Sequence, residues 1–165
     1  MAKREMTPGR AKAVKGGLIS GAVLAAAMAL IAPWEGTKLD PYKDIVGVWT
    51  VCTGETRVQM RRYTPGECNA LLRKALESDY APAVVAAVPE IRQHHGPFVA
   101  SISLTYNIGA RAFARSTVAR RFNAGQWRAG CDAFLMWDKA GGKVVKGLTR
   151  RREAERQVCL KGEVR

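Results

Sequence analysis

The sequence predicts an α+β fold in which one short β-hairpin is followed by about six helices. β-branched and aromatic residues nearly alternate from Ile45 to Gln59, a pattern typical of a hairpin. The segments after it repeat apolar residues at helical spacing instead. With 165 residues, 47% of them hydrophobic, the chain can build one domain with a buried core. Strands and helices that are segregated along the chain are typical of the α+β class.

The first 34 residues have the pattern of a membrane-targeting segment. Residues 1–15 carry five basic side chains and one acidic one, and residues 16–34 carry no formal charge. A basic flank is expected to stay on the cytoplasmic side of a membrane. The uncharged segment would form a weak membrane helix, because residues 16–32 reach only about 25 Å against a hydrocarbon core of about 30 Å. Many of its residues are also Ala or Gly.

Three interpretations of residues 16–34 compete: a cleaved signal peptide, a permanent anchor, and an anchor that can leave the bilayer. Cleavage would leave Glu35 close to a frayed chain end, a poor place for a residue that needs a fixed position. We therefore favour a releasable anchor that becomes the first helix of the domain formed by residues 35–165. One helical face could then dock on a core; its residues are Ile19, Val23, Ala27, Leu30 and Trp34.

The helix that follows the hairpin has a clear start signal. Thr64 is a favourable N-cap, Pro65 suits the first turn, and Glu67 completes a capping box. The helical pattern continues from Gly66 to Val88, and Pro82 should bend or break it, because proline lacks the N–H that a helix interior requires.

Four further helices are expected. The segment from Gly96 to Gly109 is apolar enough to be a buried helix, and Ser116 is a plausible N-cap for a short basic helix within residues 114–126. A helix that begins at Trp127 should be stopped by Gly141 and Gly142. The segment 147–160 forms the last helix.

The chain is strongly basic, with a net charge of +13. After residue 34 it still carries 22 basic and 13 acidic residues. Such a surface suits an anionic partner: nucleic acid, an anionic membrane or an anionic cell-wall polymer. Charge alone does not separate these three.

The four cysteines fit no zinc-binding spacing such as CxxC. An even number of cysteines beside an export signal favours disulfides. Three pairings are possible, and we favour the two that join near neighbours in sequence: Cys52 with Cys68, and Cys131 with Cys159. Four buried thiols are the alternative.

Two carboxylates and a hydroxyl follow the uncharged segment at short range. Asp44 lies nine residues after Glu35, and Thr50 lies six residues after Asp44. A carboxyl group among apolar neighbours holds its proton and can act as an acid, whereas one in a polar loop stays ionised. This pair of environments is used to cleave glycosidic bonds, with a hydroxyl available to hold the attacking water. By spacing alone the pattern is common, and the two acids could be surface charges.

Three stretches resemble the phage-type lysozymes, the glycoside hydrolases known as endolysins of tailed phages. They are "WEGTKLDPYKDIVGVWTVCTGET" from Trp34, "ASISLTYNIGARAFARSTVARRFNAGQW" from Ala100, and "GGKVVKGLTRRREAERQVC" from Gly141. Together they cover roughly residues 34–159. The weak export segment upstream is similar to that of the signal-arrest-release subgroup.

The resemblance implies a lysozyme-like fold, with a cleft between a small lobe and a helical lobe, and specific roles. Glu35 would be the general acid, Asp44 would activate water or stabilise positive charge, and Thr50 would hold the water. An arginine is expected beside the acid, and the tail motif gives that role to Arg151, with Arg150 as the alternate. No cofactor or metal is implied.

The implied substrate is peptidoglycan, cleaved at the β-1,4 bond between N-acetylmuramic acid and N-acetylglucosamine so that the host cell lyses. The protein would be a monomer without a nucleic-acid partner. It would be held inactive at the host inner membrane, with its catalytic domain on the periplasmic side, and would act in the periplasm after release. Rival functions are a lytic transglycosylase and a non-catalytic membrane-anchored binding module.

Two positions depart from the family's Gly-x-Gly-His pattern: Cys52 replaces the first glycine and Glu55 replaces the histidine. Glu55 is either a surface carboxylate or a residue that tunes Asp44. Two other features carry weaker signals. His94 and His95 lack a third ligand at useful spacing and are expected to be a loop pair, and Trp127 and Trp137 are more typical of core packing than of sugar stacking.

Overall fold

The computed structural model describes residues 19–161. The basic segment 1–15 and the first residues of the expected anchor, 16–18, lie outside this range. Helices and strands follow in this order: α1 (Gly21–Glu35), β1 (Lys38–Lys43), β2 (Trp49–Cys52), α2 (Pro65–Ala75), η1 (Leu76–Tyr80), α3 (Ala81–Ala87), η2 (Pro89–Gln93), α4 (His95–Ile108), α5 (Ala110–Ala114), α6 (Thr117–Asn123), α7 (Trp127–Asp132), η3 (Ala133–Trp137), β3 (Lys139–Ala140), β4 (Lys143–Val144) and α8 (Lys146–Lys161).

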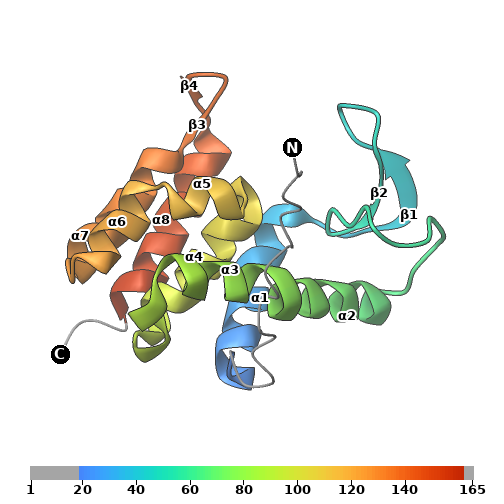
Figure 1. Ribbon diagram of the computed structural model, residues 1–165. Coiled ribbons are helices and arrows are strands. Elements are labelled where there is room, and N and C mark those ends of the chain that lie inside the picture. The colour runs from blue at the N-terminus through green and yellow to red at the C-terminus, as the bar shows by residue number, and fades with distance from the viewer. Residues whose placement is uncertain (1–18, 162–165) are drawn as a thin grey trace, which may run out of the picture.

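Two hydrophobic clusters define two lobes, as Figure 1 shows. The larger cluster is formed by helices packed around α4, whose residues 96–105 are all buried. The smaller cluster joins the β1–β2 hairpin to α2 through Val51, Tyr63 and the Cys52–Cys68 pair. Helix α2 contributes to both, because Cys68 belongs to the small cluster and Leu72 to the large one. The α+β fold class expected from the sequence is therefore confirmed.

Helix α1 packs on the helical lobe, mainly against α4. Its buried residues are Val23, Leu24, Ala27 and Ile31. The predicted face is correct at Val23 and Ala27, but Leu30 and Trp34 are only half-buried, so the real apolar stripe is rotated toward Leu24 and Ile31. Among residues 19–161, no helix has both the length and the apolar character needed to cross a membrane.

The first hairpin lies earlier in the chain than predicted. Its strands are β1 and β2, which pair antiparallel with Tyr42 opposite Thr50, whereas residues 45–48 form the connecting turn. The prediction of a hairpin over 45–59 is correct for β2 and for the antiparallel bridge between Val51 and Glu55. It is wrong for residues 45–48, which are apolar residues of a turn. Asp44 caps this turn, and β2 ends where Cys52 and Gly54 adopt positive φ angles of 58° and 97°.

The start signal of α2 is confirmed. The Thr64 side chain accepts a hydrogen bond from the Glu67 N–H, and the Glu67 carboxylate accepts one from the Thr64 N–H. Farther on, the five residues before Ala81 form a π-helical turn, and α3 then restarts with Pro82 in its first turn. Pro82 cannot donate a backbone hydrogen bond, so the predicted interruption is also confirmed.

The four helices expected in the C-terminal half are present, but their ends differ and the structure adds the short helix α5 between two of them. Helix α4 is buried as expected, and Ser116 caps α6 by accepting a hydrogen bond from the Ala119 N–H. The helix that begins at Trp127 ends earlier than predicted, since η3 stops at Trp137. Gly141 and Gly142 instead form the turn of a second small hairpin, β3–β4, at positive φ angles of 56° and 77°. The expectation of a single β element was therefore wrong.

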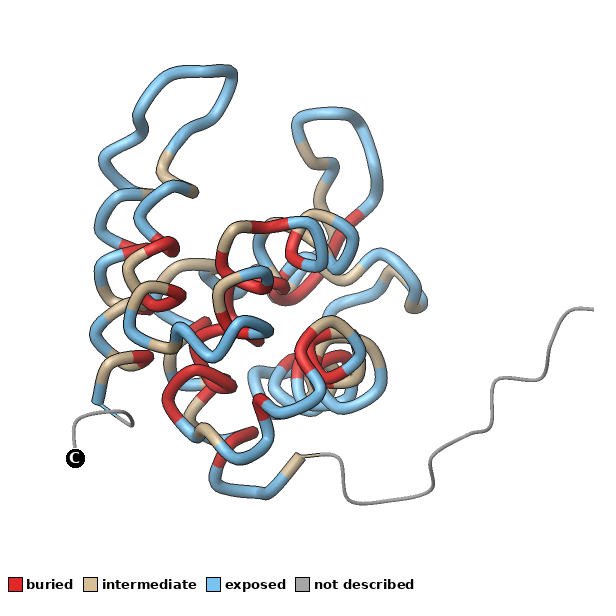
Figure 2. The backbone as a smooth tube through the Cα atoms, turned by 60° about the vertical axis from the view of Figure 1, so that its left-hand side comes forward, coloured by how far each residue is buried: buried red, intermediate tan, exposed pale blue. Residues whose placement is uncertain are grey.

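Each lobe contains one disulfide. Cys52–Cys68 joins the end of β2 to α2, and Cys131–Cys159 joins α7 to α8. This is the near-neighbour pairing that the sequence favours. Closing loops of 16 and 28 residues restricts the unfolded chain, and each such link typically contributes about 3 kcal/mol to the free energy of unfolding. Buried positions gather along the inner sides of the helices (Figure 2).

Helix α7 approaches α6 so closely that Gly130 has no room for a side chain. A Cβ there would lie 2.3 Å from the Phe122 ring, which is stacked on Trp127. We predict that Gly130→Ala lowers the free energy of unfolding by about 1–3 kcal/mol, because the ring is buried and cannot move freely. Urea denaturation measures this. Gly66→Ala is the matched control, since a Cβ at Gly66 meets nothing within 4 Å; equal effects of the two substitutions would contradict the prediction.

Candidate active site

Glu35 is the last residue of α1 and is held by an arginine from the far end of the chain. Arg151 Nη1 lies 2.5 Å from Glu35 Oε1, and the two side chains are 5% and 22% exposed. The neighbours of Glu35 in sequence do not bury it, because Ala32 and Pro33 are exposed. Its surroundings are set instead by α8, which contributes Arg151. Docking of α1 therefore determines where the Glu35 carboxylate lies.

Behind Arg151 lies a buried charged cluster on α8. Arg151 Nε is 3.2 Å from Glu155 Oε1, and Arg152 Nε is 2.9 Å from Glu155 Oε2. The Ser103 hydroxyl of α4 donates a hydrogen bond of 2.6 Å to the same carboxylate. Arg152 and Glu155 are fully buried. Charged residues that alternate along a helix usually form surface pairs, but here Arg151 contacts the proposed acid and Arg152 is part of the core.

Burial changes the protonation preferences of this cluster. It raises the pKa of Glu155, against the opposing effects of Arg152, Ser103 and Arg151. It also lowers the pKa of Arg152, against the attraction of Glu155. Two guanidinium groups facing one carboxylate leave an excess of positive charge, and the Glu35 carboxylate on the solvent side of Arg151 balances it. Arg150 is exposed and takes no part in the cluster.

Asp44 lies at the start of the hairpin turn and is fixed by the turn itself. Its Oδ1 accepts hydrogen bonds from the Val46 and Val48 N–H groups, each of 2.9 Å. Its backbone N–H donates to the Val48 carbonyl, which closes the turn. Within residues 19–161 no hydrogen bond to Asp44 Oδ2 is found, so this oxygen remains free to act on a substrate or water. The carboxylate thus has one anchored and one available oxygen.

Thr50 is held beside the same turn. It is 4% exposed, and its hydroxyl donates a 3.0 Å hydrogen bond to the Val48 carbonyl. With its proton used in this way, the hydroxyl oxygen can accept a hydrogen bond from a water molecule. Two residues later, Cys52 has a left-handed backbone and is fixed to α2 by its disulfide. The disulfide therefore fixes the strand end that carries Thr50.

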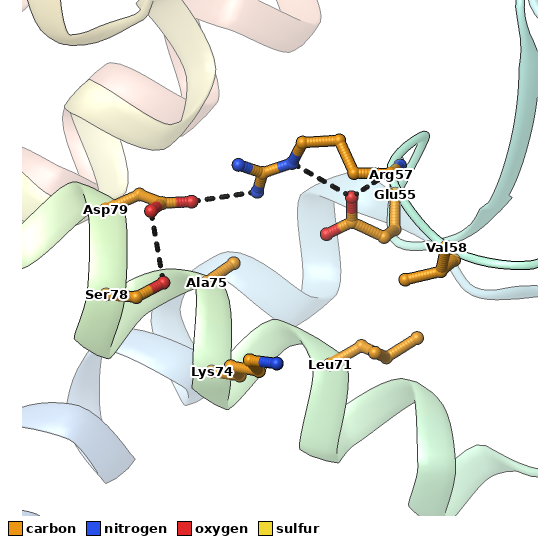
Figure 3. Close-up of a pocket in the computed structure, with 8 residues that line it drawn as sticks. All are labelled: Glu55, Arg57, Val58, Leu71, Lys74, Ala75, Ser78 and Asp79. Atoms are coloured by element: carbon orange, nitrogen blue, oxygen red, sulfur yellow. Dashed lines mark hydrogen bonds and ion pairs between the residues drawn. The ribbon is translucent and has the colours of Figure 1, made fainter.

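The loop after β2 contacts η1, which continues α2, and lines two pockets. Arg57 Nη2 lies 2.8 Å from Asp79 Oδ2, and Arg57 Nε lies 3.3 Å from Glu55 Oε1. Figure 3 shows this bridge over a pocket of about 220 Å³ that also contains Lys74 and Ser78. Glu55, Arg57 and Asp79 line a second pocket of about 250 Å³ as well. The Arg57–Asp79 ion pair thus separates two pockets between the hairpin and η1.

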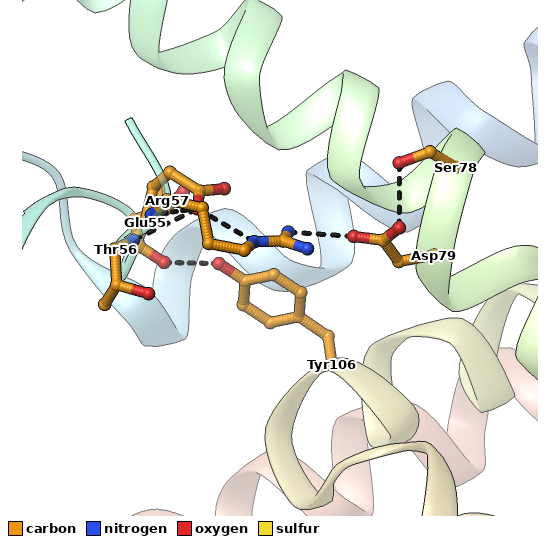
Figure 4. A network of polar contacts seen from close by, with 7 residues as sticks. Glu55, Thr56, Arg57, Ser78, Asp79 and Tyr106 are labelled. Atoms are coloured by element: carbon orange, nitrogen blue, oxygen red, sulfur yellow. Dashed lines mark hydrogen bonds and ion pairs between the residues drawn. The ribbon is translucent and has the colours of Figure 1, made fainter. Parts of the chain in front are cut away.

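The second pocket is bounded by a tyrosine from α4. The Tyr106 hydroxyl donates to the Thr53 carbonyl, and Figure 4 shows the ring beside the Arg57 bridge. Burial raises the pKa of Tyr106 to about 12; its bond to Thr53 opposes this shift and the Glu35 charge adds to it. Tyr106 therefore stays a hydrogen-bond donor at neutral pH. Glu35 therefore lies near enough to the pocket wall for its negative charge to contribute to the raised pKa of Tyr106.

The sequence predicts some of these residues and not others. It named Glu35 and Arg151, which the structure brings together, and Asp44 and Thr50, which share the Val48 carbonyl. It missed the interlobe bridge of Arg57 and Asp79, because ion pairs 22 residues apart leave no local signal. Glu55 contacts Arg57 and the backbone N–H groups of residues 56 and 57, with no contact to Asp44 among the described residues.

The histidine and tryptophan candidates pack against other side chains. His94 stacks on Trp127 with ring centroids 3.5 Å apart. Trp127 and Trp137 pack against the main core. Between residues 19 and 161 no three His, Cys, Asp or Glu side chains are grouped as metal ligands.

A helical lobe that carries Glu35 and a hairpin lobe that carries Asp44 characterise a lysozyme-like fold. The chain belongs to the phage lysozyme family, whose model, described as "Phage lysozyme", matches residues 32–155. It is 41% identical over 169 residues to the "SAR-endolysin" of Enterobacteria phage PA-2, with 96% of this chain and 99% of that protein covered.

Solved structures agree with this assignment. The fold matches the crystal structure of a mutant of P22 lysozyme with a TM-score of 0.70 and 29% identity, over 86% of this chain and 97% of that one. It also matches the active form of the P1 phage endolysin Lyz with a TM-score of 0.63 and 29% identity, over 84% and 85% of the two chains.

The buried cluster on α8 can be separated from surface charge. We predict that Glu155→Gln lowers the free energy of unfolding by about 3–5 kcal/mol, because two buried guanidinium groups lose their shared counter-charge. Glu153→Gln, two residues earlier on the same helix, is the control. Glu153 is 48% exposed and pairs only with exposed or half-exposed groups, so its loss should cost less than about 1 kcal/mol. Chemical denaturation of both variants tests this; a mild effect of Glu155→Gln would show that the cluster is not strongly coupled.

Proposed function

We propose that this protein is a muramidase that cleaves the β-1,4 bond between N-acetylmuramic acid and N-acetylglucosamine in peptidoglycan, with Glu35 as its general acid. The observation that carries the proposal is the Glu35–Arg151 ion pair at the end of the docked helix α1. It presents one carboxylate on the helical lobe while the hairpin presents a second, Asp44, with one free oxygen. Membership of the phage lysozyme family supports a glycosidic substrate.

The chemistry divides between the two carboxyl groups. The protonated form of Glu35 donates its proton to the glycosidic oxygen as the bond to the anomeric carbon breaks, so the leaving sugar departs as an alcohol and Glu35 returns to the ionised form. Positive charge develops on the ring that remains, and the Asp44 carboxylate stabilises it or removes a proton from the attacking water. Thr50 accepts a hydrogen bond from that water. Arg151 stabilises the Glu35 carboxylate that forms when the proton leaves.

Two rivals differ in their products. A lytic transglycosylase breaks the same bond without adding water and leaves an anhydro sugar, so it needs no residue to hold water. A non-catalytic binding module leaves the polymer intact. The Thr50 hydroxyl, already oriented by Val48 beside Asp44, favours the hydrolase, because it offers an acceptor for a water molecule.

We predict that Glu35→Gln lowers the rate of hydrolysis of purified peptidoglycan at least about 100-fold, the usual contribution of a general acid. Turbidity loss gives the rate and product mass separates water addition from anhydro ends. Glu90→Gln, at an exposed position of η2, should keep full activity. Hydrolysis retained in Glu35→Gln would show that Glu35 is not the general acid. An unmutated protein that binds peptidoglycan but does not hydrolyse it would favour the binding module.

We also propose that residues 16–34 anchor the chain in the host inner membrane and that release activates it in the periplasm. While this segment lies in the bilayer, α1 cannot pack on α4 and Glu35 cannot reach Arg151. Release would let α1 dock and bring the acid into the site. Support comes from the docked α1, from the likeness to the active form of the P1 phage endolysin Lyz, and from the "SAR-endolysin" relative, which 96% of this chain matches. Signal cleavage and permanent anchorage remain the two alternatives.

Docking can be weakened without making the segment less apolar. Ala27 is fully buried on α1, whereas Ala25 is exposed. Ala27→Leu and Ala25→Leu raise the hydrophobicity of the anchor equally, but only the first overpacks the α1–α4 contact, at about 1–3 kcal/mol. We predict that both variants partition alike between membrane and periplasm, and that the released Ala27→Leu protein has lower specific activity. Equal activities, or a shortened released protein, would contradict activation by docking.

A further inference from the structure

The large apolar side chains that are exposed lie in only two segments of the described chain. The first, which we call the hairpin tip, consists of the turn residues 45–48 and Trp49, the first residue of β2. The second, the C-lobe tip, surrounds the β3–β4 hairpin. Ile45 and Met136 are the most exposed of each set, at 104% and 61%. The members are Ile45, Val46, Val48 and Trp49 in the hairpin tip, and Leu135, Met136, Val144 and Val145 in the C-lobe tip.

The two tips project toward the same end of the molecule. In Figure 1 the β1–β2 turn and the β3–β4 turn both rise above the helices, and the view turned by 60° in Figure 2 shows the same two exposed loops standing above the body. Most of the remaining large apolar residues are buried or half-buried. Apolar surface is thus concentrated at two points that one extended partner could touch together.

The hairpin tip is an ordered structure that holds its apolar side chains outward. Its turn is closed by the bonds from Val46 and Val48 N–H to Asp44, and Gly47 N–H donates to the Asp44 carbonyl. The backbone polar groups are therefore largely satisfied within the turn. Only side chains such as that of Ile45 are left for a partner, and an apolar side chain held rigidly in water is a usual mark of an interaction site.

Both tips combine apolar side chains with lysines. The Lys43 ammonium lies 5.4 Å from the Trp49 ring centroid. Lys139, Lys143 and Lys146 are exposed around the C-lobe tip. The nearby acids are Asp44, whose carboxylate has one oxygen bonded to its own turn, and the half-buried Asp138. The C-lobe tip is therefore basic, whereas Lys43 at the hairpin tip is balanced by Asp44.

We propose that the two tips form a docking surface for the anionic headgroups and upper acyl region of a phospholipid bilayer. Trp and Lys side by side suit the membrane interface, where the ring enters the headgroup region and the ammonium meets phosphate. A glycan chain, in contrast, is mostly polar and does not match exposed aliphatic side chains such as those of Ile45, Val46 and Val144. The proposal rests on the membrane anchoring given under the proposed function. The hairpin begins at Lys38, a few residues after the expected anchor, and so would lie near the same membrane.

Docking through the hairpin tip has a consequence for catalysis. Asp44 stands at the base of this tip, with its carboxylate bonded to the tip backbone. A bilayer that takes up Ile45 therefore faces the Asp44 side of the site and hinders a glycan from reaching it. Anionic vesicles should then inhibit hydrolysis of soluble peptidoglycan fragments, and this inhibition depends on the tips.

The test uses the full chain and vesicles of phosphatidylglycerol and phosphatidylethanolamine, with phosphatidylcholine vesicles for comparison. Ile45→Ser and Val144→Ser each remove one exposed side chain from one tip. We expect each to weaken partition onto anionic vesicles about threefold and the double variant about tenfold. Ala86→Ser and Ala114→Ser, at exposed positions far from the tips in sequence, are controls that should bind as the unmutated chain does. All variants share the N-terminal segment, so differences report the tips.

Hydrolysis of soluble fragments gives the second readout. Without vesicles, Ile45→Ser should match the unmutated chain; with anionic vesicles, it should be inhibited less. Unchanged vesicle binding in the double variant overturns the proposal. So does a loss of hydrolysis in Ile45→Ser without vesicles, because the tip would then contact substrate. An unmutated chain that binds vesicles through the tips but hydrolyses nothing would remove the proposed function and leave the docking surface intact.

Discussion

The ion pair between Glu35 and Arg151 joins residues 116 positions apart and connects the first helix to the last. Arg151 is almost completely buried and shares Glu155 with a second buried guanidinium, that of Arg152. Charges removed from water in this way are costly unless they are balanced. Glu35 supplies the remaining negative charge from the solvent side. The same contact that completes the buried cluster thus fixes the carboxylate proposed to act as the acid.

The second carboxylate is fixed by a different principle. Asp44 depends on no distant partner among the described residues, because its own turn donates two backbone hydrogen bonds to it. Thr50 is oriented by the carbonyl that also receives the Asp44 N–H. The turn of the hairpin is therefore held by its own hydrogen bonds. The Cys52–Cys68 disulfide attaches the hairpin to α2, and the Arg57–Asp79 ion pair attaches the loop after it to η1. One half of the site is assembled locally and the other only when α1 docks.

This division gives the proposed control of activity a physical basis. A chain whose hairpin is folded but whose α1 lies elsewhere has Asp44 and Thr50 in order and lacks Glu35. Weak apolar character suits α1 to both environments: its buried side consists of Val23, Leu24, Ala27 and Ile31, while small alanines occupy much of the exposed side. The hairpin tip, proposed to face the bilayer, lies beside the half of the site that is already assembled.

The sequence by itself determined what depends on short range. The spacing of Glu35, Asp44 and Thr50, the capping box at Thr64, the break at Pro82 and the cap at Ser116 follow from local hydrogen bonds and backbone geometry that the residue types dictate. It misplaced the first hairpin, because apolar residues in a capped turn look like strand, and it extended one helix to Gly142, because a Gly pair serves equally as a stop or as a hairpin turn.

Tertiary structure alone decided which charges are buried. The tail motif favoured Arg151 over Arg150 for the site, but nothing in "TRRREAER" shows that Arg152 and Glu155 lie in the core. The packing of α8 against α4, with Ser103 donating to Glu155, makes that choice. The link between Arg57 and Asp79 likewise exists only because the π-turn and the loop after β2 meet in space. Local patterns point to the proposed reacting groups, whereas their relative placement depends on contacts between residues far apart in the chain.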